Sequence, residues 1–212
     1  MKKVEFHTQK TARFFQLGEI TEQTDYIIIA CHGYAQLANY FLKWFQGVEN
    51  EKIAVIAPEG LNRFYWQGFS GRVAASWMTK EDRESDIADY VYFIDQIAYK
   101  FPNKKIIAIG FSQGAATICR WAHQTVTDIE HIILWGSVFP EGLEIETFIK
   151  KFKNPIQLVF GNADEYYSEK QISTVKSAFS NQEENIEFTS YAGGHKILYE
   201  PLTKLLQKIT SD

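Results

Sequence analysis

The sequence predicts an α/β fold, namely a doubly wound, mostly parallel sheet with helices on both faces and no large lid. Five short apolar runs are predicted as strands, at 26–31, 53–57, 105–109, 131–135 and 156–160. Nearly continuous apolar runs are typical of parallel strands whose two faces are both covered by helices. Segments of helical period alternate with these runs, which indicates βαβ units with right-handed crossovers. Only residues 136–155 separate the last two of these strands, which is too short a segment for a large lid.

The other elements are predicted from the same periodicities. Apolar residues at three- and four-residue spacing predict a helix over 86–100, and similar patterns predict helices over 112–125, 169–180 and 201–210. The segment 186–191 resembles a further strand, and the more polar segments 4–8 and 12–17 predict an edge hairpin. No linker, repeat or low-complexity tract divides the chain, so residues 1–212 are predicted to form a single domain.

Composition and charge limit the classes of function. The net charge is −4 without charged blocks, which argues against nucleic-acid binding. No apolar run approaches the ~20 residues of a membrane span, and the N-terminus lacks the apolar stretch of a signal peptide. Cys31 and Cys119 lie in no CxxC motif or Cys/His cluster, so neither a metal nor redox chemistry is indicated. We expect a soluble, cytoplasmic protein that acts on a small molecule, whereas its oligomeric state is not indicated.

The motif Gly110-Phe111-Ser112-Gln113-Gly114 connects a predicted strand directly to a predicted helix. A GxSxG string arises by chance in roughly one 200-residue chain in fifteen, so its position between strand and helix is the stronger signal. The two glycines permit a strained turn that presents the Ser112 hydroxyl at the helix N-terminus. Free backbone N–H groups there favour the negative charge that develops in acyl transfer. The position predicts Ser112 as a nucleophile rather than as a helix cap.

A nucleophilic serine needs a base, and His195 is the histidine that fits. After a nucleophile elbow the acid and the histidine follow in chain order, so His7 and His32 come too early. His123 lies roughly 16 Å along the same helix, at about 1.5 Å per residue. His131 begins a strand and therefore belongs to the opposite edge of the sheet. His195 follows a predicted strand on a glycine-rich loop at the correct edge.

Asp164 is the best placed acid, because it follows the strand 156–160 through Gly161-Asn162-Ala163. A carboxylate at that position could fix the tautomer of His195 and stabilise the imidazolium. Glu165, which is adjacent, and Glu141, which lies beyond the previous strand, remain alternatives.

The run Cys31-His32-Gly33-Tyr34 follows a predicted strand and is in the position to complete an oxyanion hole. We assign the two donors to the backbone N–H groups of Tyr34 and Gln113. Gly33 would let the backbone approach the substrate. The His32 side chain is expected to brace the loop rather than to react.

Five segments together resemble a known family. They are His32-Gly33-Tyr34, Ala57-Pro58-Glu59-Gly60, Gly110-Phe111-Ser112-Gln113-Gly114-Ala115, Gly161-Asn162-Ala163-Asp164 and Gly193-Gly194-His195. With them the chain resembles the phospholipase/carboxylesterase branch of the α/β-hydrolases, which includes acyl-protein thioesterases. The resemblance implies a cofactor-free Ser/Asp/His esterase with its oxyanion hole at Tyr34 and Gln113. The chain departs from the family pattern in two segments. At 34–39 the family often has a glycine-rich stretch with an acidic residue, whereas this chain has Tyr-Ala-Gln-Leu-Ala-Asn. At 165–167 the family often has a short apolar-Pro step, whereas this chain has Glu-Tyr-Tyr. Both segments belong to pocket-forming loops.

Aromatic residues are concentrated in the loops expected near the site. The residues predicted to bind substrate are Trp66, Phe69, Trp77, Phe139 and Tyr166. An apolar pocket suits esters or thioesters of small or medium acyl groups, cleaved through an acyl-serine intermediate. A peptidase or lactonase on the same triad is an alternative, as is a non-catalytic binding protein that keeps the fold.

Overall fold

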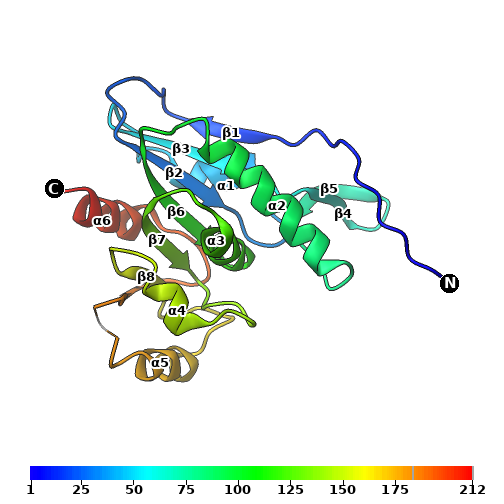
Figure 1. Cartoon of the computed structure of the whole chain (residues 1–212). Helices are drawn as coiled ribbons and strands as arrows, with labels where there is room; N and C mark the ends of the chain where they lie inside the picture. Colours follow the sequence, from blue (N-terminus) through cyan, green and yellow to red (C-terminus); the bar gives the residue numbers. More distant parts are fainter. Residues whose placement is uncertain (183, 212) are drawn as a thin grey trace.

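A seven-stranded sheet forms the centre of the computed structural model, which describes residues 1–182 and 184–211 (Figure 1). The strands lie in the order β1-β3-β2-β6-β7-β8-β9. Their bounds are Phe14–Leu17 (β1), Tyr26–Cys31 (β2), Ile53–Pro58 (β3), Lys105–Phe111 (β6), Ile129–Trp135 (β7), Ile156–Gly161 (β8) and Ile186–Tyr191 (β9). Neighbouring strands are parallel except for β1 and β3, which are antiparallel. The predicted fold class is confirmed.

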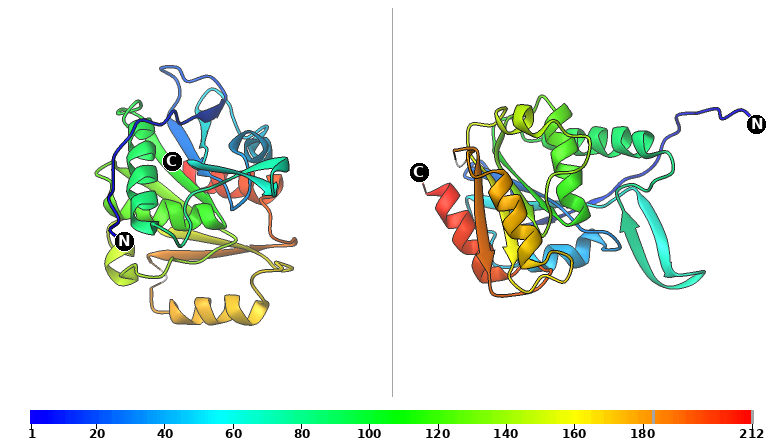
Figure 2. Two further views of the ribbon diagram at one scale, coloured as in Figure 1. Left: turned by 90° about the vertical axis from the view of Figure 1, so that its right-hand side faces the viewer. Right: turned by 90° about the horizontal axis from the view of Figure 1, so that it is seen from below.

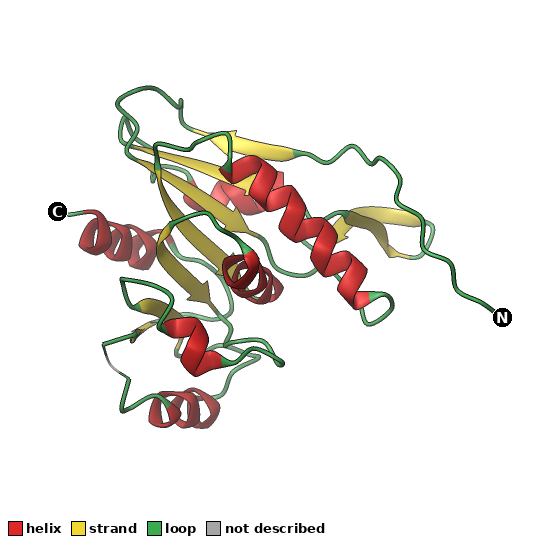
Figure 3. Cartoon of the chain, viewed as in Figure 1, coloured by secondary structure: helices red, strands yellow, loops and turns green. Residues whose placement is uncertain are grey.

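Helices cover both faces of the sheet (Figure 2, Figure 3). They are α1 (Ala38–Phe41), the 3-10 helix η1 (Leu42–Phe45), α2 (Arg83–Ala98), α3 (Gln113–Gln124), α4 (Ile145–Ile149), α5 (Glu169–Ala178) and α6 (Tyr199–Thr210). Strand β2 shows how the two cores form, because successive side chains of a strand point to opposite faces. Ile27 and Ile29 pack with α2 and α3, whereas Ile28 and Ala30 pack with α1 and α6.

The predicted N-terminal hairpin does not form. Residues 4–8 are exposed and belong to no strand, and the N-terminal segment extends away from the sheet (Figure 1). Strand β1 instead pairs with β3, from Phe14 opposite Pro58 to Leu17 opposite Val55. For β1, the edge of β3 provides both backbone hydrogen-bond partners and an apolar surface. The polar segment 4–8 would provide the partners but not the apolar surface.

A two-stranded antiparallel sheet, which the sequence did not predict, projects from the body of the molecule (Figure 2). It consists of β4 (Asn62–Gln67) and β5 (Ser70–Ser76). Between β7 and β8 the described chain forms only the short helix α4, so no large lid covers the carboxyl ends of the strands. Among the described residues, no helix is long and apolar enough to cross a membrane.

Candidate active site

Ser112 occupies a strained turn between β6 and α3. Its φ of 52° and ψ of −117° are unusual for a residue with a side chain. A Cβ added at Gly110 would lie 2.4 Å from Cα of Ala115, and one at Gly114 would lie 2.1 Å from the carbonyl oxygen of Cys31. Neither contact is possible, so both glycines are required for strand and helix to approach this closely. The turn therefore presents Ser112 at the N-terminus of α3.

Asp164 and His195 lie together at the same edge of the sheet. Nδ1 of His195 is 2.8 Å from Oδ2 of Asp164, and the two side chains are 9% and 0% exposed. The other carboxylate oxygen, Oδ1, accepts the backbone N–H groups of Tyr166 and Tyr167 at 2.9 and 3.2 Å. When Nδ1 donates its proton to this carboxylate, Nε2 is left as the acceptor. The carboxylate thus fixes both the ring and its tautomer.

The imidazole of His195 lies beside Phe111, the residue before Ser112, and beside Gly136, which follows β7. Its ring centroid is 4.7 Å from that of Phe111, and a Cβ at Gly136 would be 2.9 Å from its Cε1 atom. The backbone N–H of Ser112 donates to the carbonyl of Trp135, which precedes Gly136. Within the described chain no hydrogen bond joins the Ser112 hydroxyl to His195, and such bonds often tighten only when substrate binds.

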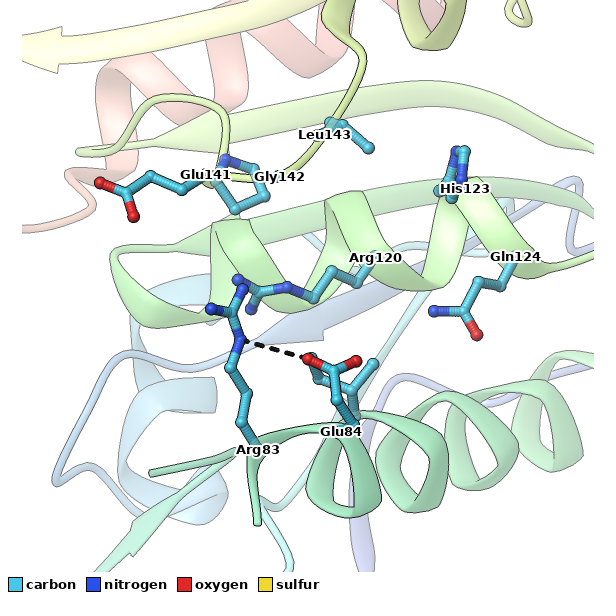
Figure 4. Close-up of a pocket in the computed structure, with 10 residues that line it drawn as sticks. Arg83, Glu84, Arg120, His123, Gln124, Glu141, Gly142 and Leu143 are labelled. Carbon is cyan, nitrogen blue, oxygen red and sulfur yellow. Dashed lines mark ion pairs between the residues drawn. The ribbon is translucent and has the colours of Figure 1, made fainter. Parts of the chain in front are cut away.

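The two alternative acids have other surroundings. Oε2 of Glu165 accepts the backbone N–H of His195 at 3.0 Å, and this hydrogen bond lowers the pKa of the Glu165 carboxyl. Glu165 therefore contacts the backbone of the loop rather than the imidazole. Glu141 lines a separate cavity of about 480 Å³ between α2, α3 and the segment that follows β7 (Figure 4). His123 lines the same cavity, whereas Ser112 and His195 do not.

His32 is fully buried and braces the loop after β2, as predicted. Its Nδ1 lies 2.8 Å from the carbonyl oxygen of Gly33, and its Nε2 accepts the backbone N–H of Gly60 at 2.9 Å. The proton therefore belongs on Nδ1. Burial lowers the pKa of His32 to about 4, so the ring is neutral near neutral pH. A neutral, doubly hydrogen-bonded ring fixes the loop without taking part in proton transfer.

Gln113 is the first residue of α3, where backbone N–H groups have no partner within the helix, and in the described loops the N–H of Tyr34 donates to no backbone group. Both segments are tied to the end of β5. The N–H of Ala35 donates to the carbonyl of Ala75 at 2.9 Å, and the Gln113 side chain accepts the N–H of Trp77 at 3.2 Å. The side-chain nitrogen of Gln113 donates to the backbone carbonyl of Met78. The root of the hairpin thus holds both segments in place, and Gly33 lies against the ring of Phe111, the residue before Ser112.

Two of the residues predicted to bind substrate are buried in the structure. Trp77 is fully buried, and its indole N–H donates to the carbonyl of His32 at 2.8 Å. Phe139 is 8% exposed and packs edge-on against Phe148 and Phe179. Both rings belong to the core on the α2 and α3 side of the sheet, where burying large apolar rings is most favourable.

The other three predicted pocket residues are exposed. Tyr166 lies over His195 with ring centroids 4.6 Å apart, whereas Trp66 and Phe69 belong to the projecting hairpin. The sequence places Phe64 among the aromatic residues expected near the site but does not predict that its ring stacks on that of Tyr34, with 5.7 Å between centroids. The alternation of Phe64 and Trp66 along one strand indicates only that these two rings share a face.

The comparisons with known proteins agree with this geometry. Residues 18–211 match the family model described as Phospholipase/Carboxylesterase. The chain belongs to this family of α/β-hydrolases. It is therefore an esterase-type hydrolase, and the resemblance found in its motifs is confirmed.

Solved structures with the same fold include several esterases. Acyl-protein thioesterase 2 of Zea mays is 19% identical with a TM-score of 0.69, over 94% of this chain and 99% of that one. Esterase PE8 is 17% identical with a TM-score of 0.70, over 93% and 99%. The Bacillus cereus carboxylesterase is 14% identical with a TM-score of 0.64, over 94% of each chain. A search of curated proteins found no match.

In residues 1–182 and 184–211, no group of three or more His, Cys, Asp or Glu side chains is arranged to hold a metal ion. The chemistry available at the Ser112 edge consists of a hydroxyl, an imidazole with its carboxylate, and two backbone N–H groups.

Proposed function

We propose that the protein hydrolyses carboxylic esters or thioesters of small or medium acyl groups through an acyl intermediate on Ser112. The observation that carries the proposal is the 2.8 Å contact between His195 and the buried Asp164, at the sheet edge where the strained Ser112 turn lies. A base oriented by a carboxylate beside a serine at a helix N-terminus is the arrangement that acyl transfer requires.

In this mechanism Nε2 of His195 accepts the proton of the Ser112 hydroxyl as Oγ attacks the carbonyl carbon. The backbone N–H groups of Tyr34 and Gln113 donate to the resulting oxyanion. Asp164 stabilises the imidazolium without itself becoming protonated. His195 then gives its proton to the leaving alcohol or thiol, and water repeats the sequence to release the acid. The thioester option is supported by likeness in fold to an acyl-protein thioesterase.

The surroundings of the site favour small, soluble substrates. Between β7 and β8 the described chain forms only the five-residue helix α4, so the site is open. Trp66, Phe69 and Tyr166 offer exposed rings that an acyl group could contact. We expect no steep activation by lipid micelles, and a strong activation would contradict this assignment. A location in the cytoplasm remains a prediction from the sequence.

A fluorophosphonate probe tests the proposal directly, because it labels only an activated serine. We expect labelling of the native protein at neutral pH and none of Ser112→Ala. Ser137→Ala is the matched control, since Ser137 lies in the next loop and its hydroxyl bonds only to the neighbouring backbone. Absence of labelling would favour a non-catalytic binding protein. A panel of p-nitrophenyl esters of increasing chain length then gives the acyl preference, and negligible rates throughout would contradict the esterase assignment.

A further inference from the structure

The β4–β5 hairpin places a cluster of aromatic rings beside the proposed oxyanion loop. We call Tyr34, Phe64 and Trp66 the aromatic shelf. Ring centroids are 5.7 Å apart for Tyr34 and Phe64, 5.9 Å for Tyr34 and Trp66, and 6.3 Å for Phe64 and Trp66. Phe64 and Trp66 alternate along β4, so they share one face of the hairpin, and Tyr65 points to the other.

The shelf is open to solvent. Tyr34 is 52% exposed and Trp66 is 46% exposed, although large rings are usually well covered. An exposed group of aromatic side chains on a projecting element is typical of a binding surface. The guanidinium of Arg72 lies 5.5 Å from the centroid of the Trp66 ring, and this cation–π contact helps to fix the ring.

The shelf is also continuous with the proposed catalytic site. Tyr34 contributes its ring to the shelf, while its backbone N–H is the proposed oxyanion donor. The root of the hairpin is bonded to both halves of the oxyanion hole, through Ala35 with Ala75 and through the Gln113 side chain with Trp77. The proposed oxyanion donor and the shelf therefore share one residue, Tyr34, and a substituent on the reacting carbonyl would approach the shelf at its ring.

We propose that the shelf binds a planar aromatic ring of the substrate, so that the preferred substrates are arylalkanoic esters or thioesters. This inference rests on the proposed function and specifies its substrate class. A planar ring stacks on other rings with a gain beyond burial of its area, whereas a flexible alkyl chain loses more conformational freedom when it is ordered on an open surface. An open shelf thus favours aromatic over alkyl groups.

The experiment compares kcat/KM for methyl 3-phenylpropanoate and methyl hexanoate in the whole protein. The ratio of the two values, aryl over alkyl, should fall about fivefold in Trp66→Leu, which keeps an apolar side chain but removes the ring. The change should appear mainly in KM for the aryl ester. Trp66→Phe restores a ring and should recover most of the ratio. Tyr65→Leu is the matched control on the opposite face of the same strand and should leave the ratio unchanged.

Fluorophosphonate labelling of each variant separates the two proposals. Labelling that persists with an unchanged aryl/alkyl ratio in Trp66→Leu would overturn the shelf and leave the esterase function standing. An equal loss for both esters would show a merely apolar surface and would also overturn the aromatic preference. Absence of labelling in the native protein would overturn both proposals. Should Trp66→Leu fail to fold, Phe64→Leu tests the same stack through its other ring, with the same expected fall in the ratio.

Discussion

The Ser112 turn and the His195 loop are held in place in different ways. The turn depends on the absence of side chains, since a Cβ at Gly114 would lie 2.1 Å from the carbonyl oxygen of Cys31. The loop depends on two particular carboxylates, Asp164 on the imidazole and Glu165 on the backbone N–H. Substitutions of the turn glycines should therefore first affect folding, whereas substitutions of the two loop carboxylates should first affect catalysis.

The largest effect is expected at Asp164. In Asp164→Asn the buried carboxylate becomes an amide that stabilises the wrong tautomer of His195 and cannot stabilise its imidazolium. We expect kcat to fall about 10⁴-fold, a barrier increase of about 5.5 kcal/mol, with little change in thermal stability. Steady-state kinetics and thermal unfolding measure the two quantities. Asp128→Asn makes the same change at an exposed position and should leave both unchanged. A loss below tenfold in Asp164→Asn would remove Asp164 from the mechanism.

Gly114→Ala tests the turn side of the comparison. We expect it to destabilise the fold by about 4 kcal/mol or more, because the added methyl group meets backbone atoms that cannot move independently. Gly68→Ala is the control, since Gly68 has a φ of +67° but nothing within 4 Å of an added Cβ. Its cost should be only about 1 kcal/mol of backbone strain. Urea unfolding measures both, and a Gly114→Ala variant as stable as the native protein would contradict a turn fixed by close packing.

Sequence predicted the parallel sheet well, because its strands are buried on both faces and are therefore apolar throughout. Strand β2 has the predicted bounds, and β8 extends the prediction by Gly161 alone. The strands β4 and β5 form a separate two-stranded sheet and are mostly exposed. They therefore contain a mixture of polar and aromatic residues and lack the continuous apolar run that predicts a buried strand. The segment 4–8 alternates like a strand, but the structure gives it no partner.

For the site, topology predicted which sheet edge would carry Asp164 and His195, but it could not predict the contact between them. That contact depends on how two loops fold back, including the bond from Gly193 to the Asn162 side chain. Nor could the sequence separate pocket rings from core rings. Trp77 and Trp66 have the same apolar character, and only packing decides that the first is buried and the second exposed.

A pH effect on the free energy of unfolding should arise from His32, whose backbone packs against Gly114 of the Ser112 turn. Because burial lowers its pKa to about 4, the folded protein keeps His32 neutral while the unfolded chain takes up a proton below about pH 6.5. The stability due to the neutral ring is complete above pH 6.5 and is lost as the pH falls toward 4, by about 3 kcal/mol in total. Urea unfolding across this range should show a shallower pH dependence for His32→Gln than for the native protein. Parallel curves would contradict the assignment.

The smallest effect is expected at Glu165, the second carboxylate of the His195 loop. Glu165→Gln keeps an oxygen that can accept the His195 N–H and should leave kcat within about twofold of the native value, whereas Glu165→Ala should lower it about fivefold. KM should change less than kcat, because the side chain bonds to the loop backbone. In the native protein the same hydrogen bond lowers the pKa of the Glu165 carboxyl, so at neutral pH both variants are compared with an ionised side chain. An equal loss in both would show that charge rather than the hydrogen bond positions His195. No loss in either would leave Asp164 as the side chain on which the loop depends.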